Sequence, residues 1–514
     1  MGKSFSKQNN GILPAIILAA SPVVICIIVT LLGGGTVFDV WSPYSGWSDE
    51  LFYFKQAESV AEFGMPQGFW GFNESSAMHG GFAAWGPLII YPFALILKII
   101  NGAMFAPILL NLILLSVSLF LTSRSFKLDL LKAVLLAVGL CAFAPVCRYT
   151  LSYMSEILIL SLTLVFFSLV MRESQEHSIY IQLLMCIILI YLISLRPYFV
   201  ILSVFQWYSA YIHRKKSCYL FILSAIGGTG LYMIMGKYFK AGYFDGIYTD
   251  WLGKSVTHGP RLVIREIGER LSSQIVQLGY IMRQTIVSDN RDGGLWIAFF
   301  LTSLLLLLSG VICLTQRKKE KENKTRAIMI LLLFATQVIT CLAVFIMYNL
   351  FAGNRHLIVF IVLDIVFLTA FTKHRYISLG IISLVFVFIF VIKGNAYKIP
   401  LSDRVHRAEF ESLRGELNNI MSLENTGWDN TVIVPDADLT EAMNDDIGGM
   451  EILYALPAGY AISYCEEEYV LSNIDSLNSS WLIAYEGSEA DRAAIENGFE
   501  NVGYLRGYRI YKRR

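Results

Sequence analysis

The chain has 514 residues, of which 55% are hydrophobic and only 16% are charged, against about 25% charged residues in a typical soluble domain. A water-soluble protein of this length could not cover its surface with this small number of charges. Most of the chain must therefore face lipid. The composition therefore excludes a disordered chain, a fibre and a secreted disulfide scaffold.

The overall net charge of +1 hides a division of the chain near residue 394. From Lys398 onward, 21 Asp or Glu stand against 10 Lys or Arg, a net charge of −11, whereas residues 1–393 hold 19 acids and 31 bases, a net charge of +12. A basic, very apolar body of residues 1–393 therefore precedes an acidic tail of residues 394–514. Because nucleic acids and anionic lipids repel negative charge, we expect neither to be a partner of the tail.

Apolar runs in the body have about the length of a bilayer-spanning helix, roughly 20 residues. A further stretch at 82–100 contains Gly86, Pro87 and Pro92, which weaken a straight helix. The sequence therefore predicts a polytopic α-helical membrane protein of 11 spans, at 11–34, 103–122, 130–147, 150–171, 178–195, 197–212, 218–236, 295–315, 327–348, 356–372 and 376–393.

Basic residues in the short connections indicate whether 82–100 crosses the bilayer. If it does not cross, the strongest basic clusters, at 213–216, 317–326 and 373–375, all lie on the cytoplasmic side, as the positive-inside rule requires. We therefore predict that 82–100 is a re-entrant or juxtamembrane segment. The N-terminus is then cytoplasmic, and a first loop of 35–102, a second loop of 237–294 and the tail are extracytoplasmic. In a bacterium this topology places the protein in the plasma (inner) membrane.

The tail is predicted to fold as a small α/β domain. Helical spacing of apolar residues marks one helix at Arg404–Met421, and a capping pattern marks another at about 488–498. Short apolar runs separated by Gly, Asp and Asn predict strands at Thr431–Pro435, Tyr460–Tyr464, Trp481–Tyr485 and Tyr504–Tyr511.

Asp49 and Glu50 form an adjacent acidic pair among aromatic residues shortly after the first span. Charge is costly so close to the bilayer, which favours a general base or a metal ligand at the membrane surface. The other interpretation is a helix start, because Ser48, Asp49 and Glu50 suit the first turn of a helix over 49–62. The residues alone leave these two interpretations open.

The chain resembles the GT-C superfamily of integral-membrane glycosyltransferases. The resemblance rests on the acidic pair after the first span, the long first loop, the many-span body and the C-terminal domain on the outer side. Shorter matches follow in chain order. Residues 85–102 resemble the family's proline-containing juxtamembrane segment, and Tyr153 and Glu156 resemble its Tyr–Glu pair. Arg196-Pro197 resembles its Arg-Pro corner, and Arg355-His356 resembles its basic residue before a late span. The chain departs from the family at 79–81, where His-Gly-Gly replaces a Lys or a His-Pro-Pro pattern.

The resemblance implies an inverting hexosyltransferase. Its donor is a sugar on a polyprenyl-phosphate carrier such as undecaprenyl phosphate, and its acceptor is a glycan or lipid-linked glycan of the cell envelope, as in O-antigen, teichoic acid or wall polysaccharide. Asp49 would accept the proton of the acceptor hydroxyl, with Glu50 assisting. The sequence shows no required cofactor, and this pair could share a divalent cation with phosphate oxygens. The donor phosphate gains charge as the bond breaks, and the candidates to bind it or the substrate are Arg355, His356, Arg196, Arg148, Glu156, Tyr153 and His79.

Two other classes of membrane protein compete with this interpretation. A polysaccharide polymerase or ligase would also depend on a lipid carrier, but the Asp49-Glu50 loop would then have no role. A secondary transporter with a soluble accessory domain would be expected to show two related halves, and the sequence has no internal repeat. The charges of 261–283 favour a solvated helix face over substrate contact, and Asp364, in the middle of a span, is expected to be structural.

Overall fold

The fold is described from a computed structural model of the chain. The description covers residues 11–32, 48–66, 70–74, 82, 86–176, 178–212, 216–239, 259–287, 293–315, 321–347, 354–372, 375–392, 407–421, 428–435 and 450–514.

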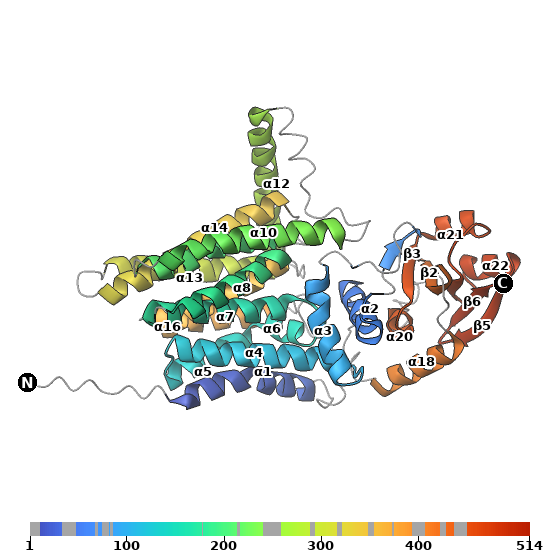
Figure 1. Cartoon of the computed structure of the whole chain (residues 1–514), viewed down its shortest axis with the longest axis horizontal. Helices are drawn as coiled ribbons and strands as arrows, with labels where there is room; N and C mark the ends of the chain where they lie inside the picture. Colours follow the sequence, from blue (N-terminus) through green and yellow to red (C-terminus); the bar gives the residue numbers. More distant parts are fainter. Residues whose placement is uncertain are drawn as a thin grey trace, which may run out of the picture.

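A bundle of long apolar helices forms the body (Figure 1). Eight helices of the described residues are long and apolar enough to cross a membrane, and a helix pair bent by 76° would add a ninth. The chain is therefore a multi-pass membrane protein. The eight are α1 (Ile12–Leu32), α4 (Ala106–Ser125), α7 (Glu156–Glu176), α10 (Leu220–Tyr238), α13 (Gly294–Thr315), α14 (Lys321–Met347), α16 (Ile358–Phe371) with η4 (Asn354–Leu357) before it, and α17 (Arg375–Phe386) with η5 (Val387–Ile392) after it; the bent pair is α5 (Leu130–Ala142) and α6 (Ala144–Thr150).

Two further predicted spans coincide with shorter helical segments. These are α8 (Ile179–Leu195) and the pair η1 (Pro197–Leu202) and α9 (Ser203–Tyr211), followed by η2 (Lys216–Tyr219). Polar side chains join them inside the bundle, since Gln206 Nε2 donates to the Gln182 carbonyl at 3.2 Å and Ser224 Oγ donates to Gln206 Oε1 at 2.6 Å. Helix α9 therefore runs back alongside α8 and packs on α10.

The first loop contributes α2 (Ser48–Phe63), β1 (Trp70–Phe72) and α3 (Pro87–Ile99). Pro87 occupies the first turn of α3 and Gly86 precedes it with a φ of 70°, a backbone conformation that glycine adopts without strain. With 13 residues, α3 is shorter than the spans, and it lies across one end of the bundle instead of along it (Figure 1). That 82–100 does not cross the bilayer stays a prediction. We call this end, where the tail lies, the tail-side end.

The tail contains a mixed sheet with the strand order β1-β3-β2-β4-β6-β5. The β1–β3, β2–β3 and β2–β4 pairs are parallel, and the β4–β6 and β5–β6 pairs are antiparallel. The α/β character of the tail is thus confirmed, and β1 of the first loop completes its edge. The elements are α18 (Arg407–Ile420), η7 (Trp428–Asn430), β2 (Thr431–Pro435), α20 (Met450–Ala455), β3 (Ala461–Cys465), α21 (Glu467–Asn473), β4 (Trp481–Tyr485), α22 (Glu489–Glu496), β5 (Phe499–Leu505) and β6 (Tyr508–Arg513).

The last predicted strand, Tyr504–Tyr511, differs from the structure. It is a hairpin, in which β5 ends at Leu505 and β6 begins at Tyr508. The two connecting residues, Arg506 and Gly507, have φ angles of 48° and 84°, the positive values that a tight two-residue hairpin turn requires. Apolar residues lie on both sides of this short turn, which is why the pattern did not reveal the break.

Candidate functional site

Helix α2 carries Glu50 into the interior of the protein. Glu50 is fully buried, and its Oε1 accepts a hydrogen bond of 2.9 Å from the backbone N–H of Tyr153. Because α2 begins at Ser48, the helix-start interpretation of the acidic pair is confirmed. Asp49 is the second residue of α2, and its side chain lies outside the described residues. The helix start does not exclude a chemical role, since Glu50 points toward the turn where other predicted residues lie.

The turn between α6 and α7 is held by one buried amide. Asn111 of α4 is fully buried, and its Nδ2 donates to the carbonyls of Tyr149, Thr150 and Ser152 at 3.3, 3.1 and 2.8 Å. This amide therefore supplies hydrogen bonds to three backbone carbonyls of the turn within an apolar bundle, where unpaired carbonyls are costly. The motifs of the sequence did not single out Asn111, although an Asn within an apolar run is a visible signal.

Immediately after this turn, Glu156 begins α7 and meets two arginines. Its Oε1 lies 2.5 Å from Nη2 of Arg196 and 3.8 Å from Nε of Arg355. The Glu156 side chain is 1% exposed and that of Arg355 is 22% exposed. Three of the predicted residues, from α7, the end of α8 and η4, are thus brought together, and Arg355 is the one with an exposed part.

Tyr198 links Arg196 to His356. The Tyr198 hydroxyl lies 2.8 Å from Nδ1 of His356, and Nη1 of Arg196 donates to the same hydroxyl at 3.4 Å. His356 is buried, and its ring meets that of Tyr198 edge-on at 5.4 Å between centroids. The predicted basic residues of two distant segments therefore lie in one network. Tyr198, which follows the Arg-Pro corner directly, is a member that the sequence analysis did not identify.

The structure gives less detail about the contacts of the remaining predicted residues. Tyr153 is fully buried and contacts Phe54 of α2 and Phe93 of α3, each at 5.3 Å between ring centroids. Arg148 is buried in α6, five residues before Tyr153. His79 lies outside the described residues.

Further along α2, a charged cluster docks this helix on the tail. Glu58 of α2 lies 2.6 Å from Nζ of Lys55 and also pairs with Arg414 of α18. Lys55 in addition donates to the carbonyl of Leu456 in the tail. Burial lowers the pKa of Lys55, Arg414 acts in the same direction, and the Glu58 carboxylate opposes both. Helix α2 is thus held between the bundle and the tail.

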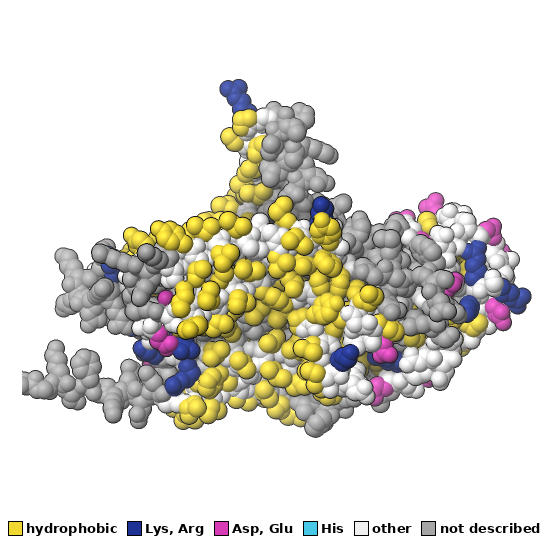
Figure 2. Space-filling model, viewed as in Figure 1, with side chains coloured by type: hydrophobic (Ala, Val, Ile, Leu, Met, Phe, Trp, Pro, Cys, Tyr) yellow, Lys and Arg dark blue, Asp and Glu magenta, His cyan; other side chains and the backbone are white. Residues whose placement is uncertain are grey.

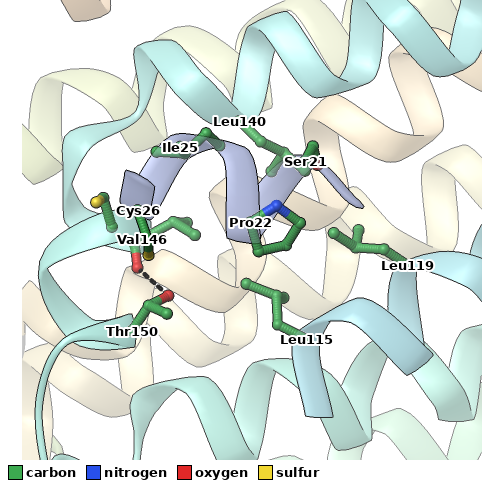
Figure 3. A pocket seen from close by; sticks show the side chains of 10 residues that line it. Ser21, Pro22, Ile25, Cys26, Leu115, Leu119, Leu140, Val146 and Thr150 are labelled. Carbon is green, nitrogen blue, oxygen red and sulfur yellow. Dashed lines mark hydrogen bonds between the residues drawn. The ribbon is translucent and has the colours of Figure 1, made fainter. Parts of the chain in front are cut away.

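Two hollows in the bundle differ in what they could hold. The small pocket of Figure 3, between α1, α4, α5 and α6, has a volume of about 10 Å³, which is room for roughly one water molecule.

A groove of about 300 Å³ between α13 and α14 is lined mainly by Phe and Leu side chains, with Ser303 and Gln337 among them. Ser303 Oγ donates to Gln337 Oε1 at 2.9 Å, and the Gln337 amide donates to Asp364. Asp364 is thus hydrogen-bonded internally.

Among the described residues, no group of three or more His, Cys, Asp or Glu side chains is arranged to hold a metal ion. A carboxylate site for a divalent cation needs several oxygen ligands. Of the acidic pair, the structure describes only the Glu50 side chain.

No known protein-family model matches the chain, and no curated protein matches it. Solved structures do. ArnT from Cupriavidus metallidurans bound to undecaprenyl phosphate is 9% identical, covering 95% of this chain and 97% of ArnT, with a TM-score of 0.43. The Archaeoglobus fulgidus oligosaccharyltransferase in its apo form is 12% identical, covering 94% of this chain and 70% of that protein, with a TM-score of 0.46.

Proposed function

We propose that this chain is an inverting glycosyltransferase that moves a hexose from a polyprenyl-phosphate carrier to a cell-envelope glycan. The carrier's chain would stay in the bilayer while its phosphate reaches the tail-side end of the bundle. A lipid-borne donor of this kind explains why a transferase has so many spans. Undecaprenyl phosphate is the proposed carrier, and a glycan or lipid-linked glycan such as O-antigen, teichoic acid or wall polysaccharide is the proposed acceptor.

One observation carries this proposal. The same short turn binds Glu50 through the Tyr153 N–H and leads directly into Glu156, which pairs with Arg196 and lies 3.8 Å from Arg355. A carboxylate from α2 and a cluster of cationic groups therefore flank one turn at the end of the bundle. Transfer from a phosphate carrier needs both: an acceptor for the hydroxyl proton and positive charge for the departing phosphate.

The proposed roles combine these positions with the family resemblance, which assigns the role of base to Asp49. Asp49 accepts the proton of the acceptor hydroxyl as the acceptor oxygen bonds to the sugar's anomeric carbon. The bond from that carbon to the phosphate oxygen breaks, and the phosphate leaves with the electron pair. Arg355 binds this phosphate, while Arg196 and His356 fix its surroundings through Glu156 and Tyr198. Free Asp has a pKa of about 3.9, so Asp49 is a weak base, sufficient if the proton leaves late, when the sugar is already oxocarbenium-like. If the transfer uses a divalent cation, the carboxylate oxygens of Asp49 and Glu50 would bind it.

The apolar groove between α13 and α14 is the proposed path of the carrier's chain. α13 packs against η4, which contains Arg355 and His356. A chain lying along this groove would therefore reach the cationic cluster with its phosphate. The groove opens between exposed apolar side chains, among them Leu304 and Val338, so a prenyl chain could enter it from the lipid.

We further propose eleven crossings, with a cytoplasmic N-terminus and an extracytoplasmic tail in the bacterial plasma membrane. The spans beyond the eight long helices are the bent pair α5–α6, α8, and η1 with α9. The Gln182–Gln206 contact supports the last two as an antiparallel hairpin. A membrane-impermeant thiol reagent applied to intact cells should fail to label a cysteine introduced at Lys216. Labelling at this position would overturn the proposed count.

The proposed activity is tested with purified protein and a synthetic polyprenyl-phosphate hexose carrying a labelled sugar. With an envelope-glycan acceptor, the label should move to the glycan and free polyprenyl phosphate should appear in equal amount. A donor that is bound but never consumed, over a panel of hexoses and acceptors, would contradict the proposal. Release of polyprenyl phosphate without labelled glycan would instead indicate hydrolysis.

A further inference from the structure

Helix α12 (Pro260–Val287) in the second loop is long and amphipathic, and most of it projects from the side of the bundle (Figure 1). Its 28 residues extend about 42 Å at 1.5 Å per residue. Six of them are charged, so the helix is not a span. An apolar stripe nevertheless follows one face at intervals of three and four residues, formed by Ile264, Ile267, Leu271, Ile275, Leu278 and Met282.

The C-terminal end of α12 is fixed at the bundle. Leu278 and Ile281 are buried, and α12 packs on α13 and α14. The Gly293 backbone N–H donates to Thr285 Oγ1 at 3.0 Å, and a Cβ at Gly293 would lie only 2.5 Å from that oxygen. The span α13 begins at the next residue. The base of α12 therefore lies at the tail-side boundary of the membrane, and its direction is set by a close backbone contact.

From this base α12 runs across the direction of the spans (Figure 1). Two residues of its apolar stripe are exposed, Ile264 at 71% and Ile275 at 56%. Ile267, Leu271 and Met282 are half-buried, and Leu278 is buried. Figure 2 shows apolar side chains along one side of α12 that continue into the apolar flank of the bundle. On another face of the helix, Arg265 and Glu269 form an exposed ion pair of 2.7 Å.

We infer that α12 is a membrane-surface helix whose apolar stripe lies in the leaflet on the tail side. Helix α12 lies across the spans at the membrane boundary, and its apolar stripe is continuous with the lipid-facing side of the bundle. These are the requirements for interfacial binding. The occupant of its apolar face is therefore lipid acyl chain, and Arg265 and Glu269 face the headgroups and water. The prediction of a solvated helix face thus holds for one face of α12 only. This inference is independent of the proposed catalytic activity.

Spin labels placed one at a time on the intact protein in nanodiscs of phosphatidylethanolamine and phosphatidylglycerol test the inference. Labels attached through p-acetylphenylalanine leave the native cysteines untouched. At Ile264 and Ile275, collisions with oxygen should exceed those with the water-soluble nickel complex NiEDDA, as at the lipid-facing reference Ile226 of α10. At Arg265, Glu269 and Ser272 the order should reverse, as at the reference Ile495 in the tail.

Two results would overturn this inference. If NiEDDA dominates at Ile264 and Ile275 as well, then α12 stands in water. If neither reagent reaches these two positions, then protein covers the stripe, from this chain or from a second copy. Normal spectra at Ile226 and Ile495 in the same preparations would show that the bundle and the tail are folded, so either result would concern α12 alone.

Discussion

Glu156 and Arg196 form an ion pair of 2.5 Å at the tail-side end of the bundle, with side-chain exposures of only 1% and 5%. Each member is anchored separately, because Glu156 begins α7 and Arg196 ends α8. The pair therefore fixes two helices relative to each other. It also sets the position of Arg355, which reaches Glu156 from η4.

Replacing Glu156 by glutamine should destabilise the protein strongly. Removal of one member of a buried ion pair leaves the other charge uncompensated and typically costs about 3–5 kcal/mol. The measurement is thermal unfolding in detergent, with Glu176→Gln as the matched control. Glu176 pairs with Arg172 at 2.9 Å in an exposed position, where such a pair contributes at most about 1 kcal/mol. Equal shifts for the two variants would contradict the proposed importance of the buried pair.

The Arg355→Ala variant should keep its fold and lose transfer activity. Arg355 is partly exposed, so its loss leaves no fully buried charge, whereas Arg196 still compensates Glu156. Removal of a group that stabilises developing charge lowers kcat by roughly 100- to 1000-fold. Arg172→Ala, at an exposed position away from the cluster, serves as the control and should retain its rate. A wild-type kcat for Arg355→Ala would show that this residue does not stabilise the departing phosphate.

The contact between Glu58 and Arg414 should couple the tail to the rate of transfer. Both side chains belong to the cluster that holds α2 against the tail. A double-mutant cycle of Glu58→Gln and Arg414→Gln should give an interaction energy of about 0.5–3 kcal/mol in thermal unfolding. The single variants should also lower kcat more than they raise KM, because α2 carries the acidic pair. Additive stabilities with unchanged kcat would show that the tail does not support α2.

Filling the groove between α13 and α14 should weaken donor binding without changing the chemical step. Leu304→Trp places a large ring in the groove, where Leu304 is a lining residue. The expected result is a higher KM for the polyprenyl donor with an unchanged kcat, since only binding of the chain is affected. Leu308→Trp is the control, because Leu308 is also exposed on α13 but is not a lining residue of this groove. The same increase in KM for both variants would argue against the proposed path.

The sequence predicted the helical body well because lipid-facing spans reveal themselves by length and apolarity alone. The motifs also singled out Glu156, Arg196 and Arg355 as candidate site residues, and the structure brings these three side chains together. The sequence did not identify Asn111 or Tyr198, because their roles depend on partners such as Tyr149 and His356 that only the fold brings near.

The docking of α2 on the tail was equally invisible in the sequence. Lys55 and its carbonyl partner Leu456 are 401 residues apart. Strand β1 pairs at the edge of a sheet whose other strands all follow in the chain from Thr431 onward. Neither periodicity nor charge pattern within a local window reports a contact of that range. The hairpin turn at Arg506 was missed for a different reason, since apolar residues lie on both sides of it.

The most direct test of the proposed function is the rate of labelled-sugar transfer by Asp49→Asn and Glu50→Gln, measured beside wild type with one polyprenyl-phosphate donor. We expect Asp49→Asn to lose at least about 100-fold in kcat, the lower range for loss of a general base. Glu50→Gln should lose less, because an amide oxygen can still accept the Tyr153 N–H. Both variants should unfold at the wild-type temperature. Wild-type kcat in a folded Asp49→Asn variant would contradict the proposal that this acidic pair carries the chemistry.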